Sequence, residues 1–246
     1  GACAFKTIAV DLTDAADCKQ KLGALANTTH IFYAARYDHN SSGPEPIDLN
    51  TNMLRHLVDA VEPAAANLQH IHMVQGSKYY GSTLPAYKTP ALESDPRVAN
   101  NANFYYAQED YLFALQQVKP VKGRWTWSAS RPHGVVDPEP GVARSMPLMM
   151  GAYAAIEREL GRPLCFPGTE RSFHALYQSV DATLLARAIA WITASKFFDR
   201  WVSSRMMSRK CASPAFRPVM STAAQVSPTI SPPVSRNAST TTSEAS

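Results

Sequence analysis

Two hydrophobic periods alternate along the first 195 residues of the chain, and each change of period marks a predicted strand or helix. Short apolar segments predict strands at residues 5–10, 29–35, 70–75 and 125–130. Apolar residues at helical spacing predict helices at residues 15–25, 50–61, 104–118, 148–160 and 181–194. A short strand or an extended segment is predicted at residues 162–168.

Strands that alternate with helices in this way are typical of an α/β protein whose parallel sheet is covered by helices on both faces. In such sheets, ligands bind at the carboxyl ends of the strands. At the ends of predicted strands, or just after them, lie Asp11, Ala34, the segment Gln75–Lys78 and the segment 132–135. We therefore expect these residues to line one crevice along a single edge of the sheet.

The pattern is lost at about residue 195. Residues 196–246 contain seven of the 24 basic residues but only two of the 20 acidic ones. Residues 213–246 are rich in Ser, Thr and Pro and contain few large apolar side chains, so they cannot bury enough surface to offset the chain entropy of folding. We expect residues 196–246 to form a basic, disordered tail.

The net charge of +4 comes from this tail, because the first 195 residues carry nearly equal numbers of acidic and basic side chains. A nearly neutral body argues against a nucleic-acid-binding surface. The four cysteines form no C-x-x-C pair and no cluster of metal-ligand spacing, which predicts a reduced, cytoplasmic chain without a bound metal. No apolar run reaches the roughly 18 residues of a membrane span, and no signal peptide is recognised.

The candidate catalytic residues are Lys78, after the predicted strand at 70–75, and Tyr105 and Tyr106, at the start of a predicted helix. A lysine can hold a nicotinamide ribose, and its charge lowers the pKa of a nearby phenol, which can then donate a proton near neutral pH. Reduction of a carbonyl or an enone requires such groups. The same tyrosines also fit the packed face of a helix, and His133 fits either a proton donor or a structural residue.

Seven motifs follow one another in a fixed order within the first 195 residues. They are His30–Ala35, Asn52–Arg55, Gln75–Gly81, Asn103–Asp110, Trp127–His133, Ser145–Met146 and Tyr153–Ile156. Together they resemble the progesterone 5β-reductase and iridoid synthase-like group of atypical short-chain dehydrogenases/reductases. The resemblance implies a Rossmann-type doubly wound parallel sheet with a small substrate-capping region.

The resemblance also implies NADPH as the cofactor and the reduction of an enone or a ketone in specialised metabolism. Carried over by motif, Lys78 and Tyr106 are the catalytic residues, and Tyr105 is the alternative phenol. Besides Lys78 and Tyr106, the implied cofactor contacts are Asp11, Leu12, Ala34, Ala35, Arg36, Val135, Ser145 and Met146. The implied partner is a small-molecule carbonyl or enone substrate, and a homodimer is left open.

The chain departs from the family pattern at both ends. It begins at what would be the third strand, so we expect a partial sheet without the first two strands and the Gly-rich phosphate loop. The expected organisation is an incomplete NAD(P)-binding domain at residues 1–145, a substrate-capping region at 146–195 and the tail at 196–246. These departures leave open a second function, that of a non-catalytic truncated remnant or binding protein.

Overall fold

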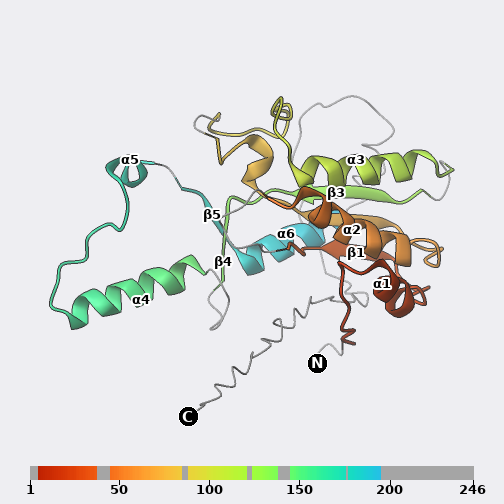
Figure 1. The fold of residues 1–246 in the computed structure, drawn as a ribbon, viewed down its shortest axis with the longest axis horizontal. Helices are drawn as coiled ribbons and strands as arrows, with labels where there is room; N and C mark the ends of the chain where they lie inside the picture. The colour runs from red at the N-terminus through yellow and green to blue at the C-terminus, as the bar shows by residue number, and fades with distance from the viewer. Residues whose placement is uncertain are drawn as a thin grey trace, which may run out of the picture.

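The computed structural model describes residues 5–37, 45–84, 88–120, 124–137, 145–175 and 177–194. At its centre, three parallel strands form a sheet in the order β1 (His30–Tyr33), β2 (His70–Val74) and β3 (Thr126–Ser130) (Figure 1). Because the strands are parallel, their carboxyl ends meet at one edge of the sheet. The predicted parallel α/β sheet is therefore confirmed.

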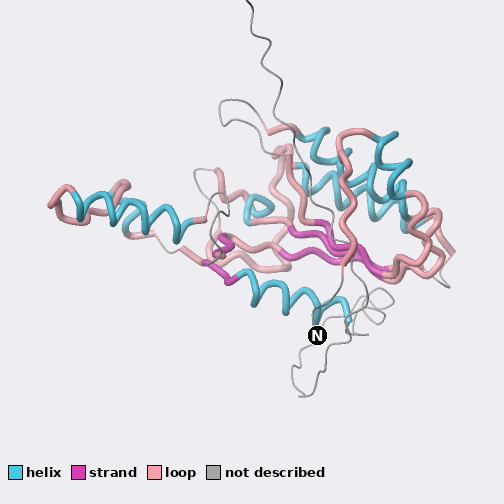
Figure 2. The backbone as a smooth tube through the Cα atoms, turned by 90° about the horizontal axis from the view of Figure 1, so that it is seen from below, coloured by secondary structure: helices cyan, strands magenta, loops and turns pink. Residues whose placement is uncertain are grey.

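Helices cover both faces of this sheet (Figure 2). On one face lie α2 (Ile47–Val61) and α3 (Phe104–Gln117), with α1 (Ala15–Leu22) packed beside α2. On the other face lies α6 (Ala182–Ala194), which contacts β2. Within the described ranges, no helix combines the length and the apolar character that crossing a membrane requires.

Side-chain caps explain where two of these helices begin. The Asp14 carboxylate accepts hydrogen bonds from the backbone N–H groups of Ala16 and Asp17 at the start of α1. The Asn103 side chain accepts one from the N–H of Tyr105 at the start of α3. Both helices begin at the residues that the sequence predicted.

The hydrophobic core fills the space between the sheet and the layer of α1, α2 and α3. Its buried side chains include Leu22 of α1, Leu54 and Val58 of α2, Ile71 and Met73 of β2, and Leu112 of α3. The alternation of side chains along β2 thus directs Ile71 and Met73 into the core, and His70 and His72 face the other side.

Residues 5–10 do not form the predicted strand. A strand needs a neighbour with which to exchange backbone hydrogen bonds, and no described strand pairs with this segment. Val10 and Leu12 are nevertheless buried, with 3% and 2% of their surface exposed. The apolar pattern therefore marked burial in the core correctly but not β-structure.

The opposite face of the sheet carries a hydrogen-bonded row of histidine and hydroxyl side chains. The ring nitrogens of His70 lie 2.7 Å from Thr126 Oγ1 and 2.8 Å from Ser128 Oγ. Those of His72 lie 2.7 Å from Ser128 Oγ and 3.1 Å from Ser130 Oγ. Both histidines are buried, so this polar face is satisfied by its own side chains rather than by water.

We expect the stability of the protein to fall as the pH is lowered from about 6.5 to about 4. Burial lowers the pKa of His70 and that of His72 from 6.5 to about 4, and repulsion from His72 adds to the effect on His70. The unfolded chain therefore binds these protons at a higher pH than the native protein does, and acid favours unfolding. Their contribution is complete above pH 6.5 and amounts to on the order of a few kcal/mol for each histidine.

Urea unfolding at a series of pH values measures this effect. A variant with both His70→Gln and His72→Gln keeps hydrogen-bonding side chains but cannot titrate in this range. Its free energy of unfolding should depend less steeply on pH than that of the parent chain. Equal slopes for the two proteins would contradict the prediction.

A second, two-stranded parallel sheet is formed by β4 (Gly134–Val136) and β5 (Ser179–Asp181). Between these strands the chain passes through α4 (Met146–Glu159) and α5 (Glu170–Phe173), which project away from the central sheet (Figures 1 and 2). The helix predicted at 148–160 is confirmed. Residues 162–168 form no strand, which leaves the extended alternative.

The division of the chain at residue 145 stays a prediction, as does the capping role of residues 146–195. One part of the second region, α6, packs on the central sheet, whereas α4 and α5 lie away from it (Figure 2). The tail predicted at residues 196–246 lies outside the described residues.

Candidate functional site

Polar segments that follow β2 and β3 meet at the carboxyl edge of the central sheet. Arg131, directly after β3, donates from Nε to Gln75 Oε1, directly after β2, at 3.0 Å. His133 Nδ1 lies 2.8 Å from Ser77 Oγ, and the His133 ring packs against the ring of Tyr177. The predicted convergence of these two segments is therefore confirmed.

Lys78 lies on η1 (Ser77–Tyr80), a short 3₁₀ turn beyond β2, which closes at Gly81 with a φ of 82° that favours glycine. Lys78 Nζ lies 3.1 Å from each carboxylate oxygen of Glu45. Arg36 Nη2 donates to Glu45 Oε1 at 2.8 Å. One carboxylate between two cations leaves a net positive charge, which suits an anionic or hydroxyl-bearing ligand.

Glu45 is a site residue that the sequence reasoning missed. Ala34 and Ala35 follow β1 directly, and Arg36 then reaches the Glu45 carboxylate. Glu45 and Lys78 are 33 positions apart in the chain, and no local motif relates them. The folded chain shows the connection: Glu45 pairs with Arg36, in the segment after β1, and with Lys78, in the turn after β2.

The two candidate tyrosines point in different directions from the first turn of α3. The Tyr106 hydroxyl donates to the carbonyl of Tyr79 and accepts from the N–H of Val98 at 3.0 Å. The Tyr105 hydroxyl lies against Gly76, where an added Cβ would come within 3.2 Å of it. Tyr106, which the resemblance implies as the catalytic phenol, therefore has two backbone partners, and the hydroxyl of the alternative, Tyr105, lies at the end of β2. The catalytic role of either tyrosine stays a prediction.

The charge state of Tyr105 follows from its surroundings. Burial raises the pKa of Tyr105, the Arg36 cation lowers it, and the Glu45 carboxylate raises it, with a net increase. Tyr105 therefore keeps its proton at neutral pH. It is a hydrogen-bond donor there and not a phenolate base.

Asn103 connects the start of α3 to the turn that carries Lys78. Its Oδ1 caps α3 by accepting from the N–H of Tyr105 at 3.0 Å, and its Nδ2 donates to the carbonyl of Lys78 at 2.9 Å.

We expect Asn103→Ala to lower the free energy of unfolding by about 1–2 kcal/mol, because both hydrogen bonds are lost. Urea unfolding measures the change. Asn103→Asp, which keeps the cap but not the donor, should lose less, and an unchanged alanine variant would contradict the prediction.

Asp11 and Leu12 lie in the turn that precedes α1. The Asp11 carboxylate accepts from the backbone N–H of Thr13 at 2.8 Å and from its hydroxyl at 2.7 Å. The carbonyl of Leu12 lies 2.9 Å from Nδ1 of His56 on α2. The turn is thus fixed to the helical layer, and the role of both residues as cofactor contacts stays a prediction.

The remaining predicted cofactor contacts lie on β4 and at the start of α4. Val135 is on β4 with 43% of its surface exposed. Ser145 is buried, and its Oγ donates to the carbonyl of Asp137 at 3.3 Å, just before Met146 begins α4. The contact between His133 and Ser77 is one link between this region and the turn of Lys78.

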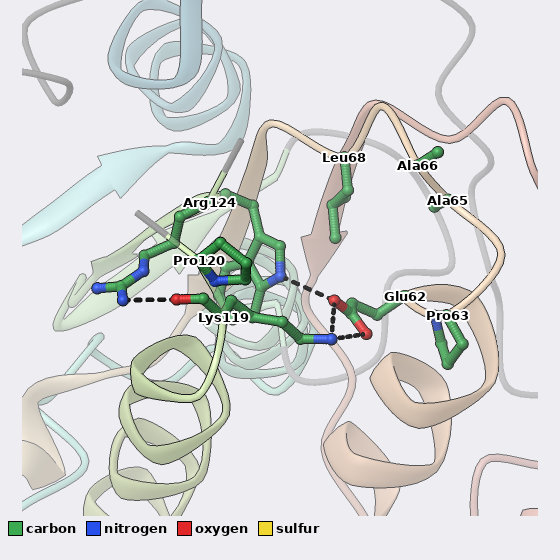
Figure 3. Close-up of a pocket in the computed structure, with 9 residues that line it drawn as sticks. Glu62, Pro63, Ala65, Ala66, Leu68, Lys119, Pro120 and Arg124 are labelled. Carbon is green, nitrogen blue, oxygen red and sulfur yellow. Dashed lines mark hydrogen bonds and ion pairs between the residues drawn. The ribbon is translucent and has the colours of Figure 1, made fainter. Parts of the chain in front are cut away.

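A small pocket of about 180 Å³ lies at the opposite end of the sheet, where β2 and β3 begin (Figure 3). It is lined by Glu62, Pro63, Ala65, Ala66, Leu68, Lys119, Pro120, Arg124 and Trp125. Figure 3 shows the Glu62 carboxylate, which pairs with Lys119 Nζ at 2.8 Å and accepts from Trp125 Nε1 at 3.3 Å. None of the predicted site residues lines this pocket, and its ion pair fastens α2 to the end of α3.

The sequence of the chain is similar to one protein family and to curated proteins. The sequence profile of the PRISE-like Rossmann-fold domain matches residues 9–205. A 3-oxo-Delta(4,5)-steroid 5-beta-reductase from Arabidopsis thaliana is 32% identical over 195 residues, which cover 77% of this chain and 49% of that protein. An (S)-8-oxocitronellyl enol synthase from Nepeta cataria is 34% identical over 190 residues, which cover 75% and 47%. The chain spans about half the length of the curated relatives it matches.

A solved structure has the same type of fold. The GDP-L-fucose synthetase from Naegleria fowleri, in a structure bound to NADP, superposes with a TM-score of 0.51 at 15% sequence identity. The superposition covers 74% of this chain and 60% of that one. It supports the Rossmann-type arrangement of strands and helices.

Proposed function

The chain belongs to the PRISE-like Rossmann-fold domain family, and from this premise we propose that it is an NADPH-dependent reductase of an enone or a ketone in specialised metabolism. The names of the two curated relatives describe a steroid reductase and an enol synthase, both of which act on small carbonyl compounds. The proposal concerns the reaction class and leaves the choice between C=C and C=O reduction to experiment.

One observation carries the proposal. The Lys78 ammonium group and the Tyr105 hydroxyl both border the turn that follows β2, at the edge where the carboxyl ends of the strands meet. Open parallel sheets bind their ligands at this edge. A cation and a protonated phenol at this position suit a reaction in which a substrate oxygen gains negative charge.

The residues present fit a nicotinamide cofactor. The absence of a side chain at Gly76 lets the Tyr105 hydroxyl approach the backbone at the end of β2, and Lys78 and Arg36 together exceed the charge of Glu45 by one. We propose that Lys78 holds ribose hydroxyls of NADPH by donating hydrogen bonds to them. The further proposed contacts are those that the sequence predicted: Asp11, Leu12, Ala34, Ala35, Arg36, Val135, Ser145 and Met146.

The proposed chemistry divides between cofactor and protein. When bound, NADPH supplies the hydride. Tyr105, which burial keeps protonated, donates a hydrogen bond to the carbonyl oxygen of the substrate and stabilises the charge that develops on it. The proton that completes the reduction comes from the Tyr105 hydroxyl, which regains a proton from solvent. Arg36 adds a positive charge beside this phenol, and Lys78 shares the Glu45 carboxylate with Arg36. Tyr106 then has a structural role, since its hydroxyl holds the backbone at Tyr79 and Val98.

Three further features of the proposal come from the sequence alone. The substrate is a small carbonyl or enone compound, the setting is the reducing cytoplasm, and a homodimer is compatible with the family. Analytical ultracentrifugation of the purified chain tests the last of these.

Consumption of NADPH by the purified chain, measured with cyclic enones, linear enones and ketones, tests the proposed reaction. Loss of the nicotinamide absorbance that depends on both enzyme and substrate, with the reduced product identified by mass spectrometry, is the expected result. Saturable NADPH binding without turnover of any carbonyl compound would favour the alternative, a non-catalytic binding protein.

A further inference from the structure

Arg131 occupies a central place between the elements that carry the proposed catalytic groups. It is the first residue after β3, and only 18% of its side chain is exposed. The sequence singles it out only by its place directly after a predicted strand and within the motif Trp127–His133. Its contacts in the folded chain set it apart.

The Arg131 guanidinium group uses each of its three nitrogens on a different partner. Nε donates to Gln75 Oε1 at 3.0 Å, Nη1 to the Tyr80 hydroxyl at 3.2 Å and Nη2 to Glu109 Oε1 at 2.6 Å. The group also lies over the ring of Tyr79, with its carbon 3.6 Å from the ring centroid. This combination needs a planar fork, which a lysine ammonium group cannot replace.

Two of these partners belong to the turn that carries Lys78. Tyr79 and Tyr80 follow Lys78 directly on η1, and Arg131 holds one by its ring face and the other by its hydroxyl. The position of Lys78 relative to the sheet therefore depends on these contacts, together with the bond from Asn103 to the Lys78 carbonyl.

The other two partners belong to the environment of Tyr105. Glu109 lies one helical turn beyond Tyr105 on α3. Gln75, which accepts from Arg131, donates from Nε2 to the carbonyl of Tyr105 at 3.3 Å. Glu109 is buried with 5% of its surface exposed, and its second oxygen accepts from Arg97 Nη2 at 3.0 Å. A buried carboxylate of this kind keeps its place only while it is paired.

We propose that Arg131 is a positioning residue, which joins the turn of Lys78 to the helix of Tyr105 and so fixes the separation of the ammonium and phenol groups. The inference rests on the proposed function, because it assigns these two groups to one reaction. Arg131 acts through its neighbours, since each nitrogen of its side chain already has a partner within the protein.

Arg131→Lys is the variant that tests the proposal, because it keeps the charge near Glu109 and removes the fork. Displacement of reacting groups by about 1 Å can cost up to roughly 100-fold in rate. We therefore expect kcat to fall by about 10- to 100-fold and the KM for NADPH to rise, because Lys78 is proposed to hold the ribose and depends on Arg131 for its position. Arg55→Lys is the matched control, because Arg55 lies over Tyr111 on the helical layer, away from the site. It should leave kcat and KM as they are.

A readout independent of turnover separates this inference from the proposed function. In protein labelled with 3-fluorotyrosine, the Tyr105 fluorine resonance is assigned by its absence in Tyr105→Phe. Arg131→Lys is expected to shift this resonance and its titration with pH, whereas Arg55→Lys leaves both unchanged. A shifted resonance in a chain that reduces no carbonyl compound would support the link between the two elements and reject the reductase.

Two results would overturn the proposal. One is an unchanged Tyr105 resonance together with an unchanged kcat. The other is a fall in kcat that merely follows the loss of folded protein, with the Tyr105 resonance of the folded fraction unmoved. If Arg131→Lys does not fold, Tyr80→Phe removes only the hydroxyl held by Nη1, and the same two readouts decide the question.

Discussion

Replacement of Tyr105 by Phe is expected to lower kcat for carbonyl reduction by about 10²- to 10⁴-fold, the usual contribution of a positioned proton donor. The hydroxyl that would be lost lies against Gly76 at the end of β2, close enough to Arg36 and Glu45 for both charges to act on its pKa. Phenylalanine keeps the ring that packs on Phe104. The variant should therefore fold, and steady-state kinetics with NADPH and an enone measures the loss.

Tyr106→Phe is the matched control, because it removes a hydroxyl from the adjacent residue of the same helix. Its hydroxyl holds the Tyr79 carbonyl and the Val98 N–H, so its loss should lower the free energy of unfolding by about 1–3 kcal/mol. The folded variant should retain most of its kcat. A severe loss of kcat in Tyr106→Phe with full activity in Tyr105→Phe would reverse the assignment and restore Tyr106 as the catalytic phenol.

Lys78→Met is expected to weaken NADPH binding by about 10- to 100-fold, the equivalent of one or two hydrogen bonds from a charged donor. Methionine fills a similar volume but offers neither the charge nor the N–H donors of the Lys78 ammonium group. Its loss also leaves Glu45 with Arg36 as its cation, which removes the net positive charge of the cluster. Quenching of tryptophan fluorescence by NADPH measures the dissociation constant.

Lys119→Met controls for the loss of a lysine elsewhere in the chain. Lys119 pairs with Glu62 at the opposite end of the sheet, in the pocket of Figure 3. This variant should bind NADPH as the parent chain does, provided that it is measured well below its unfolding temperature. Equal affinity in all three proteins would remove Lys78 from the cofactor site.

Much of the fold could be predicted because its apolar periods are regular. The helix predicted at 104–118 is α3 (Phe104–Gln117), and the strand predicted at 70–75 is β2 (His70–Val74). In α3 the buried positions recur at helical spacing. In β2 the residues His70–Met73 are all buried, and the apolar Ile71 and Met73 alternate with the two histidines. The parallel order of the sheet followed from the alternation of strands with helices.

The strands that the sequence predicted wrongly or did not predict have physical explanations. The segment 5–10 has the composition of a strand, but β-structure depends on a paired neighbour and not on composition alone. The strands β4 (Gly134–Val136) and β5 (Ser179–Asp181) are three residues long, which is too short to display a period. Their pairing joins segments that are far apart in the chain.

The segments after β2 and β3 meet, as the parallel sheet predicts, through the contacts of His133 with Ser77 and of Arg131 with Tyr80. The roles of Lys78 and of the two tyrosines in a reaction stay predictions. Tyr105 and Tyr106 could not be distinguished from the sequence, because neighbouring residues on a helix point about 100° apart and either could face the sheet edge. Glu45 and Arg131 act through partners that only the folded chain brings together.

The most direct measurement is a titration of the 246-residue chain with NADPH, followed by tryptophan fluorescence and by thermal unfolding. Saturable quenching and a rise in unfolding temperature, both diminished in Lys78→Met and retained in Lys119→Met, are the expected result. A folded sample that shows neither response to NADPH would contradict the cofactor site and, with it, the proposed reductase.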